Sequence, residues 1–143
     1  MELRTFSAVL KFTLQLEDHT AQFYQDAASS EKYSQVKQIF LTFSENSKKR
    51  KRILEKAARE SVDHSLLEPI SGLLEEDYAE SPMLSESMSY ADVLVAAKQL
   101  EQVMQKFYGD AGEKVGFIAT MSRLYKRYAL ERSKALATLQ GLP

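Results

Sequence analysis

Two glutamates stand at the same place in two copies of a repeated segment. Leu16–Ala27 has the sequence LEDHTAQFYQDA and Leu100–Ala111 has the sequence LEQVMQKFYGDA, which is six identities in twelve aligned residues without a gap. The second residue of each copy is a glutamate, Glu17 and Glu101. Carboxylates that project from two similar helices into one core are the starting point of a carboxylate-bridged metal site.

Further polar residues interrupt the apolar stripes that helices here would bury. Each of four such stripes has one charged residue halfway along it, and these residues are Glu17, Arg50, Glu101 and Glu131. Ser47 lies one helical turn before Arg50, and Tyr128 lies one turn before Glu131. An unpaired charge in a protein core costs several kcal/mol. We therefore expect these ions to meet one another or a metal ion.

Arg50 lies within five consecutive basic residues, Lys48–Arg52. At about 100° per residue, five helical positions sweep a full turn, so they cannot all face water on a packed helix. The flanking Phe43 and Leu54 select Arg50 as the inward residue. One alternative is a frayed or locally exposed helix, and another is a basic run that contacts the phosphates of a nucleic acid. The net charge of the whole chain is −1, which makes nucleic acid binding the weaker hypothesis.

The elements that would position these residues are helices. Glycine and proline are scarce, with 5 and 3 in 143 residues, and apolar residues recur at spacings of three and four. Ser29 and Ser30 break the pattern once, Ser89 is a good N-cap, and Gly112 is a good helix end. The pattern predicts helices over about 4–28, 31–62, 89–111 and 117–140, with a crossover over about 63–88 that holds a helical turn near 73–78.

Short links make neighbouring helices antiparallel, whereas the middle connection is too long for a hairpin turn. The prediction is one all-α domain over residues 1–143, a four-helix bundle of two antiparallel hairpins joined by a long crossover. This is the connectivity of ferritin-like bundles. The repeat supports it, because each hairpin contains one copy.

The repeated segments resemble those of the rubrerythrin branch of the ferritin-like superfamily. In that family, the first and third helices carry a glutamate followed seven residues later by a tyrosine, which matches Glu17 with Tyr24 and Glu101 with Tyr108. The resemblance implies a diiron site, completed by one Glu-x-x-His motif on each of the second and fourth helices.

Those two motifs are absent from this sequence. When the helices are aligned by their buried stripes, Ser47-x-x-Arg50 stands at the first motif position and Tyr128-x-x-Glu131 at the second. When the fourth helix is instead aligned by the offset of the repeat, Glu131-x-x-Lys134 stands at the second motif position. His19 lies about 200° around the helix from Glu17, and His64 falls in the crossover, so neither is expected to be a ligand.

Two hypotheses follow for this site. In the first, the metal centre is lost, and Arg50 offsets Glu17, Glu101 and Glu131 with help from the hydroxyls of Tyr24, Tyr108 and Tyr128. Three carboxylates against one cation then require either a glutamate that keeps its proton or a second cation such as Lys134. The chain would be a non-catalytic structural or interaction module without a cofactor. In the second, Glu17, Glu101 and Glu131 bind Fe or Mn in a metal-binding oxidoreductase or an iron-handling protein.

The rest of the composition narrows the function classes. The chain has no cysteine, which excludes disulfides, thiolate catalysis and rubredoxin-type iron. We expect a cytoplasmic protein without a signal peptide or a membrane span. We also expect a homodimer, or an unknown protein partner, at an exposed surface made by Tyr78, Met83, Met88 and Tyr90. Nucleic acid binding through Lys48–Arg52 remains the weaker alternative.

Overall fold

Four long helices form the protein in a computed structural model that describes residues 1–61, 68–78 and 83–143. They are α1 (Phe6–Ala28), α2 (Lys37–Glu60), α3 (Tyr90–Lys114) and α4 (Ala119–Gln140), with 3₁₀ turns η1 (Glu31–Val36) and η3 (Glu75–Asp77). Within these residues no strand occurs, and one isolated bridge joins Glu2 to Leu74. The predicted all-α bundle is confirmed at this level.

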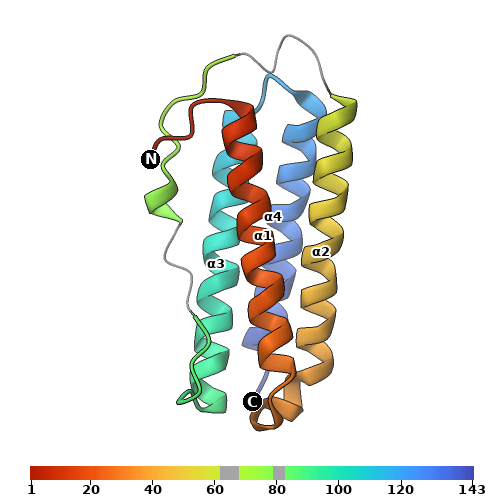
Figure 1. The fold of residues 1–143 in the computed structure, drawn as a ribbon, viewed down its shortest axis with the longest axis vertical. Coiled ribbons are helices and arrows are strands. Elements are labelled where there is room, and N and C mark those ends of the chain that lie inside the picture. The colour runs from red at the N-terminus through yellow and green to blue at the C-terminus, as the bar shows by residue number, and fades with distance from the viewer. Residues whose placement is uncertain (62–67, 79–82) are drawn as a thin grey trace.

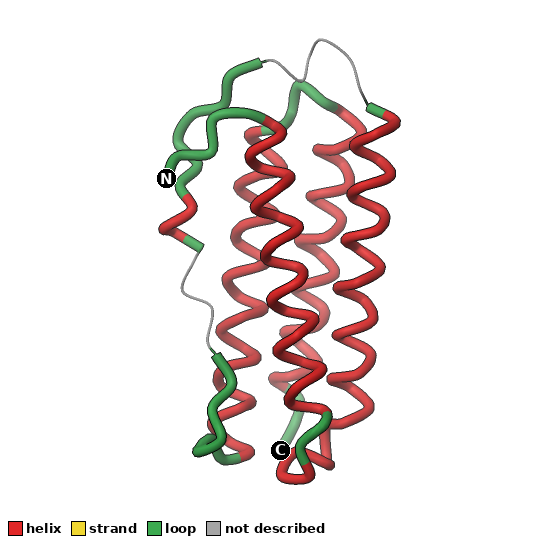
Figure 2. The backbone as a smooth tube through the Cα atoms, viewed as in Figure 1, coloured by secondary structure: helices red, strands yellow, loops and turns green. Residues whose placement is uncertain are grey.

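The helices pack as two pairs. α1 lies along α2 and α3 lies along α4, while fewer contacts join α2 with α4 and α1 with α3. In Figure 1, α2 ends at the top of the bundle and α3 begins at the bottom, so the connection between them has to traverse its length. In Figure 2 the described part of that connection is loop apart from the short turn η3.

The described middle of this connection pairs with the N-terminal segment. The Leu3 amide donates to the Leu73 carbonyl at 2.8 Å, and the Ile70 amide donates to the Arg4 carbonyl at 2.9 Å. Gly72 makes the turn between them at φ 81, a backbone conformation that favours glycine. Leu3, Ile70 and Leu73 are buried, so the two segments close one end of the core together.

The third helix begins as predicted and ends later. Ser89 and Asp92 form a reciprocal capping box at its start. Gly112 was predicted to end the helix, and this is wrong, because α3 continues to Lys114. Gly112 instead serves packing: a Cβ there would lie 3.4 Å from the Tyr125 Cβ, and the Gly112 carbonyl accepts a 2.8 Å hydrogen bond from Ser122. The missing side chain lets α4 approach α3 closely.

The second predicted helix, over about 31–62, is divided in the structure. Its first residues form η1, which the non-helical Tyr33 (φ −115, ψ 28) interrupts, and Val36 (φ −113, ψ 9) separates this turn from α2. The Tyr33 ring is buried, and its hydroxyl donates a 2.6 Å hydrogen bond to the Met88 carbonyl just before α3. This tertiary contact with the start of α3 favours the tighter turn over a continuous α-helix.

One predicted surface residue is in the core. Tyr78 was expected to be exposed in a dimer surface, but its side chain is buried. Its hydroxyl donates to Asp110 at 2.5 Å, and its ring meets Phe107 edge-on at 5.2 Å between centroids. Through these two contacts, Tyr78 packs the connection against α3. Of the other three residues, Met88 and Tyr90 are partly buried against the core, and Met83 is 78% exposed.

No helix among the described residues combines the length and the apolar composition that crossing a membrane requires.

Candidate functional site

A layer of four charged side chains crosses the middle of the bundle. Glu17 from α1 and Glu101 from α3 are completely buried, and so, to within 1% of exposed area, is Arg132 from α4. Arg50 from α2 is 6% exposed. We refer to these four residues as the ion-pair layer. Three of them were predicted to meet, whereas Arg132 was not predicted.

Arg132 bridges the two glutamates. Its Nη1 donates to both carboxylate oxygens of Glu101 at 3.1 and 2.9 Å, and its Nη2 donates to Glu17 Oε1 at 2.5 Å. Charge-assisted bonds of this forked kind are the strongest hydrogen bonds in proteins. Burial alone would lower the pKa of Arg132, but the Glu101 and Glu17 carboxylates outweigh that effect and raise the pKa. The guanidinium group of Arg132 therefore stays protonated.

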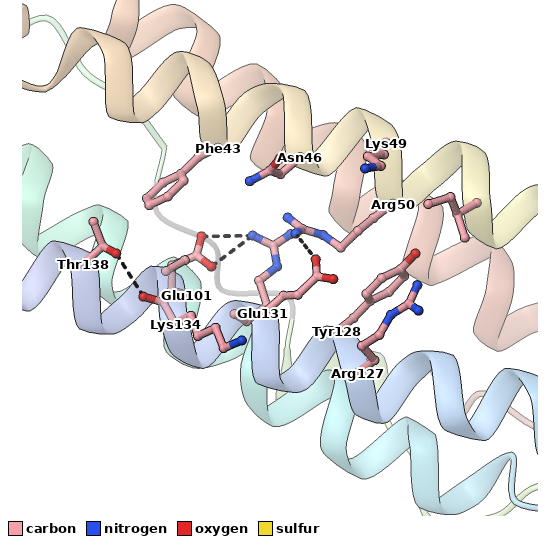
Figure 3. A pocket seen from close by; sticks show the side chains of 13 residues that line it. Phe43, Asn46, Lys49, Arg50, Glu101, Arg127, Tyr128, Glu131, Lys134 and Thr138 are labelled. Atoms are coloured by element: carbon pink, nitrogen blue, oxygen red, sulfur yellow. Dashed lines mark hydrogen bonds and ion pairs between the residues drawn. The ribbon is translucent and has the colours of Figure 1, made fainter.

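Arg50 completes the layer from the opposite side. Its Nε donates to Glu17 Oε2 at 2.9 Å, and its Nη2 donates to the Ser47 hydroxyl at 3.2 Å. Its Nη1 donates to Glu131 Oε1 at 3.1 Å, a contact that Figure 3 shows. Glu131 is not buried like the other two glutamates, because 41% of its side chain is exposed.

Two tyrosines form reciprocal hydrogen bonds between the two helix pairs. The Tyr24 hydroxyl on α1 donates to Glu101 on α3 at 2.6 Å, while the Tyr108 hydroxyl on α3 donates to Glu17 on α1. Burial raises the pKa of Tyr24 and of Tyr108 well above the ordinary value, and the neighbouring carboxylates raise both further. Each tyrosine therefore stays a hydrogen-bond donor.

Hydroxyl groups fill the remaining polar space. Thr20 and Ser47 lie 2.8 Å apart between their hydroxyl oxygens, and Arg132 Nη2 donates to Thr20 at 3.2 Å. Both residues are completely buried. The layer thus has partners for nearly all of its polar atoms, as a buried network must if it is to be stable.

These residues do not fit a diiron centre. The buried charges balance, with two carboxylates against two guanidinium groups, and all four carboxylate oxygens already accept hydrogen bonds from Arg50, Arg132, Tyr24 or Tyr108. Within residues 1–61, 68–78 and 83–143, no three His, Asp or Glu side chains are grouped so as to hold a metal ion. A cation entering this layer would meet two fixed positive charges.

Of the two expected ways to balance the carboxylates, the structure shows a second cation, and this cation is Arg132, not Lys134. Lys134, the predicted residue, is exposed to solvent, while Arg132 is buried. The predicted stripe stepped from Tyr128 to Glu131 and Ala135. The actual stripe steps from Tyr125 to Tyr128, Arg132 and Leu139, and steps of three and four are equally helical. Leu139 ends both stripes, so the apolar residues of this helix do not distinguish them.

Other predicted residues lie nearby with different roles. Tyr128 is buried, and burial raises its pKa, but its hydroxyl has no hydrogen-bond partner among the described residues and does not reach the carboxylates as expected. His19 is half-buried on the same helix as Glu17 and bonds to none of the carboxylates in the described part of the chain. His64 lies outside the described residues.

The layer has one open side. A cleft of about 660 Å³ lies between α2 and α4, and the side chains that line it include Arg50, Glu101, Glu131 and Arg132 (Figure 3). The charged floor of this cleft is therefore the edge of the ion-pair layer.

Comparison of the chain with protein-family models, with curated proteins and with solved structures gave no match.

Proposed function

We propose that the protein is a ferritin-like bundle, similar to rubrerythrins, in which an ion-pair layer has replaced the diiron centre. Its function is then that of a non-catalytic structural or interaction module. The observation that carries the proposal is Arg132, whose guanidinium lies between the two glutamates that would have bridged the metals. A fixed cation at this point takes over the electrostatic role of a metal ion.

The helix directions support the ferritin-like part of the proposal. A bundle with only short loops would alternate up and down, whereas α2 and α3 run in the same direction (Figure 1). One long connection between two antiparallel pairs is the ferritin-like arrangement. The repeated glutamate and tyrosine then fall on the first helix of each pair, as in the family that the sequence resembles.

The alternative proposal, an oxidoreductase or iron-handling site built from Glu17, Glu101 and Glu131, has less support. Glu131 lies on the far side of Arg50 from Glu17, since Arg50 bonds to both. To bring the three carboxylates onto one ion, Arg50 and Arg132 would both have to leave the layer. Moving two buried guanidinium groups away from their partners costs several kcal/mol for each.

Metal analysis distinguishes these proposals. Protein purified without a tag or chelator is analysed for metals before and after incubation with Fe(II) and Mn(II). We expect less than stoichiometric metal in both samples, an unchanged thermal unfolding midpoint and no oxygen or peroxide turnover. Near-stoichiometric metal that a Glu101→Gln variant loses would contradict the proposal and favour the oxidoreductase.

A double variant tests the layer itself. Glu17→Ala combined with Glu101→Ala strands both arginines without a counterion and should lower the free energy of unfolding by at least about 3–5 kcal/mol. The matched control is Asp18→Ala with Glu113→Ala, which removes the same charge from the exposed faces of α1 and α3. In a metal protein, the first double variant would lose its metal while the metal-free form changed little in stability. If neither property changed, the glutamates would not be buried together.

A further inference from the structure

The cleft between α2 and α4 has the size and shape of a ligand site. Its volume of about 660 Å³ lies within the range of small-molecule pockets, which is about 300–1,000 Å³. In Figure 3, Phe43, Asn46 and Lys49 line it from one helix, and Tyr128, Glu131 and Lys134 line it from the other. It opens to solvent on one side and ends at the ion-pair layer on the other.

The rim of the cleft is positively charged. Lys49 on α2 and both Arg127 and Lys134 on α4 are exposed lining residues, and none of them forms an ion pair within the part of the chain that the structure describes. With Arg50 and Arg132 the lining holds five cations against two carboxylates, and Glu17 behind it neutralises one more, which leaves an excess of two positive charges. This excess attracts an anion, and the low-dielectric walls concentrate its field.

Two buried donors at the cleft lack partners. Arg132 Nε and the Tyr128 hydroxyl have no hydrogen-bond partner among the described residues, although both side chains are about 1% exposed and both line the cleft. An unsatisfied buried donor costs roughly 1–3 kcal/mol. A ligand oxygen, or water that accompanies a ligand, would satisfy such groups.

The protein's own Glu131 indicates the kind of anion that the cleft accepts. Its carboxylate reaches Arg50 Nη1 at 3.1 Å from the cleft side while 41% of the side chain stays exposed. A carboxylate can therefore approach the floor from this direction. An incoming carboxylate would compete with Glu131 for this guanidinium.

Apolar surface lies beside these charges. Phe43 and Ile53 from α2 and Ala135 from α4 are partly buried in the walls of the cleft. We propose that the cleft binds a small organic carboxylate, with its charged end toward the rim cations and Arg50 and its apolar body against these walls. Glu131 acts as an internal competitor for Arg50. The inference goes beyond the proposed loss of the metal centre and does not depend on it.

Isothermal titration with octanoate tests this proposal on the full chain. We expect saturable binding of one octanoate per chain, and no binding of octylamine, which has the same chain length and the opposite charge. Inorganic phosphate should bind more weakly than octanoate, because it lacks an apolar body.

Charge variants locate the binding. Arg127→Gln with Lys134→Gln should weaken octanoate binding roughly 2- to 20-fold, from two solvent-exposed ion pairs. Arg123→Gln with Lys126→Gln is the matched control, since both residues are exposed on α4 and neither lines the cleft; it should leave the affinity unchanged. Glu131→Gln should strengthen binding roughly 2- to 5-fold by removing the competing carboxylate.

The proposal is overturned if octanoate shows no saturable binding, or if octylamine binds equally well. It is also overturned if the rim variant and its control have the same affinity, or if Glu131→Gln weakens binding. Binding of inorganic phosphate as tight as that of octanoate would contradict the assignment to carboxylates with an apolar body. Circular dichroism of each variant establishes that the bundle is folded before the titration.

Discussion

The two helix pairs each contribute one glutamate and one arginine to the ion-pair layer, but the number of residues between the glutamate and the arginine differs between the pairs. In the first pair, Arg50 follows Glu17 by 33 residues, and in the second, Arg132 follows Glu101 by 31. The glutamate-bearing helices α1 and α3 retain the repeated sequence, whereas α2 and α4 do not. The same charge balance is thus reached with a different residue spacing in each pair.

The two arginines also differ in their surroundings. Arg132 contacts both glutamates and is sealed in the core, while Arg50 contacts one of them and reaches toward the cleft through Glu131. Hydroxyl groups accompany the first pair, where Thr20 and Ser47 are buried, but Met104 occupies the repeat position of Thr20 on α3. The second pair therefore provides the cation that bridges both glutamates, and the first provides the hydroxyl groups and the contact with Glu131.

The largest expected effect comes from replacing the central arginine. Arg132→Met should lower the free energy of unfolding by about 3–5 kcal/mol, because it leaves two buried carboxylates with Arg50, which bonds to Glu17 and not to Glu101. Arg50→Met should cost less, about 1.5–3 kcal/mol, because Glu17 keeps Arg132 and Tyr108 as partners. Urea unfolding of both variants measures the difference, and equal losses would mean that the arginines are equivalent.

The tyrosines should behave more symmetrically. Tyr24→Phe and Tyr108→Phe each remove one hydrogen bond to a buried carboxylate and should each cost about 1.5–3 kcal/mol. Phenylalanine keeps the ring, so the aromatic packing provides an internal control. Chemical unfolding of the two single variants should give losses within about 1 kcal/mol of one another. A loss in only one of them would show that the reciprocal arrangement does not hold in solution.

The same tyrosines predict a loss of stability at alkaline pH. Unfolded tyrosine loses its proton near pH 10, whereas the raised pKa of Tyr24 and of Tyr108 keeps both protonated in the folded state. The unfolded state then binds fewer protons, so the free energy of unfolding falls as pH rises through 10, by up to about 1.4 kcal/mol per pH unit for each tyrosine. Urea titrations between pH 8 and 11 should show a shallower fall in the double Tyr→Phe variant than in the unmodified protein.

The smallest effect is expected at the edge of the layer. Glu131→Gln removes the only carboxylate partner of Arg50 other than Glu17 in the described residues, but the pair is partly solvated. The stability loss should stay below about 1 kcal/mol. Thermal and chemical unfolding measure it, and a loss comparable to that of Arg50→Met would place Glu131 within the layer.

The sequence by itself determined the helical class, the repeated glutamates and the inward direction of Arg50. These features follow from local periodicity: Glu17 and Glu101 lie on strongly apolar stripes, and only one member of the Lys48–Arg52 run can face a core flanked by Phe43 and Leu54. Charge balance also predicted either a glutamate that keeps its proton or a second cation, because a buried excess of carboxylates is unstable.

Only the tertiary structure decided which residue supplied that cation. Glu131, Arg132 and Lys134 lie on adjacent parts of one helical turn, and periodicity cannot distinguish steps of three from steps of four. The close approach of α4 to α3 at Gly112 helps fix the rotation of α4 and turns Arg132 inward, with Glu131 at the cleft and Lys134 in solvent. That rotation depends on contacts between residues distant in the chain, such as Arg132 with Glu17, which no local pattern contains.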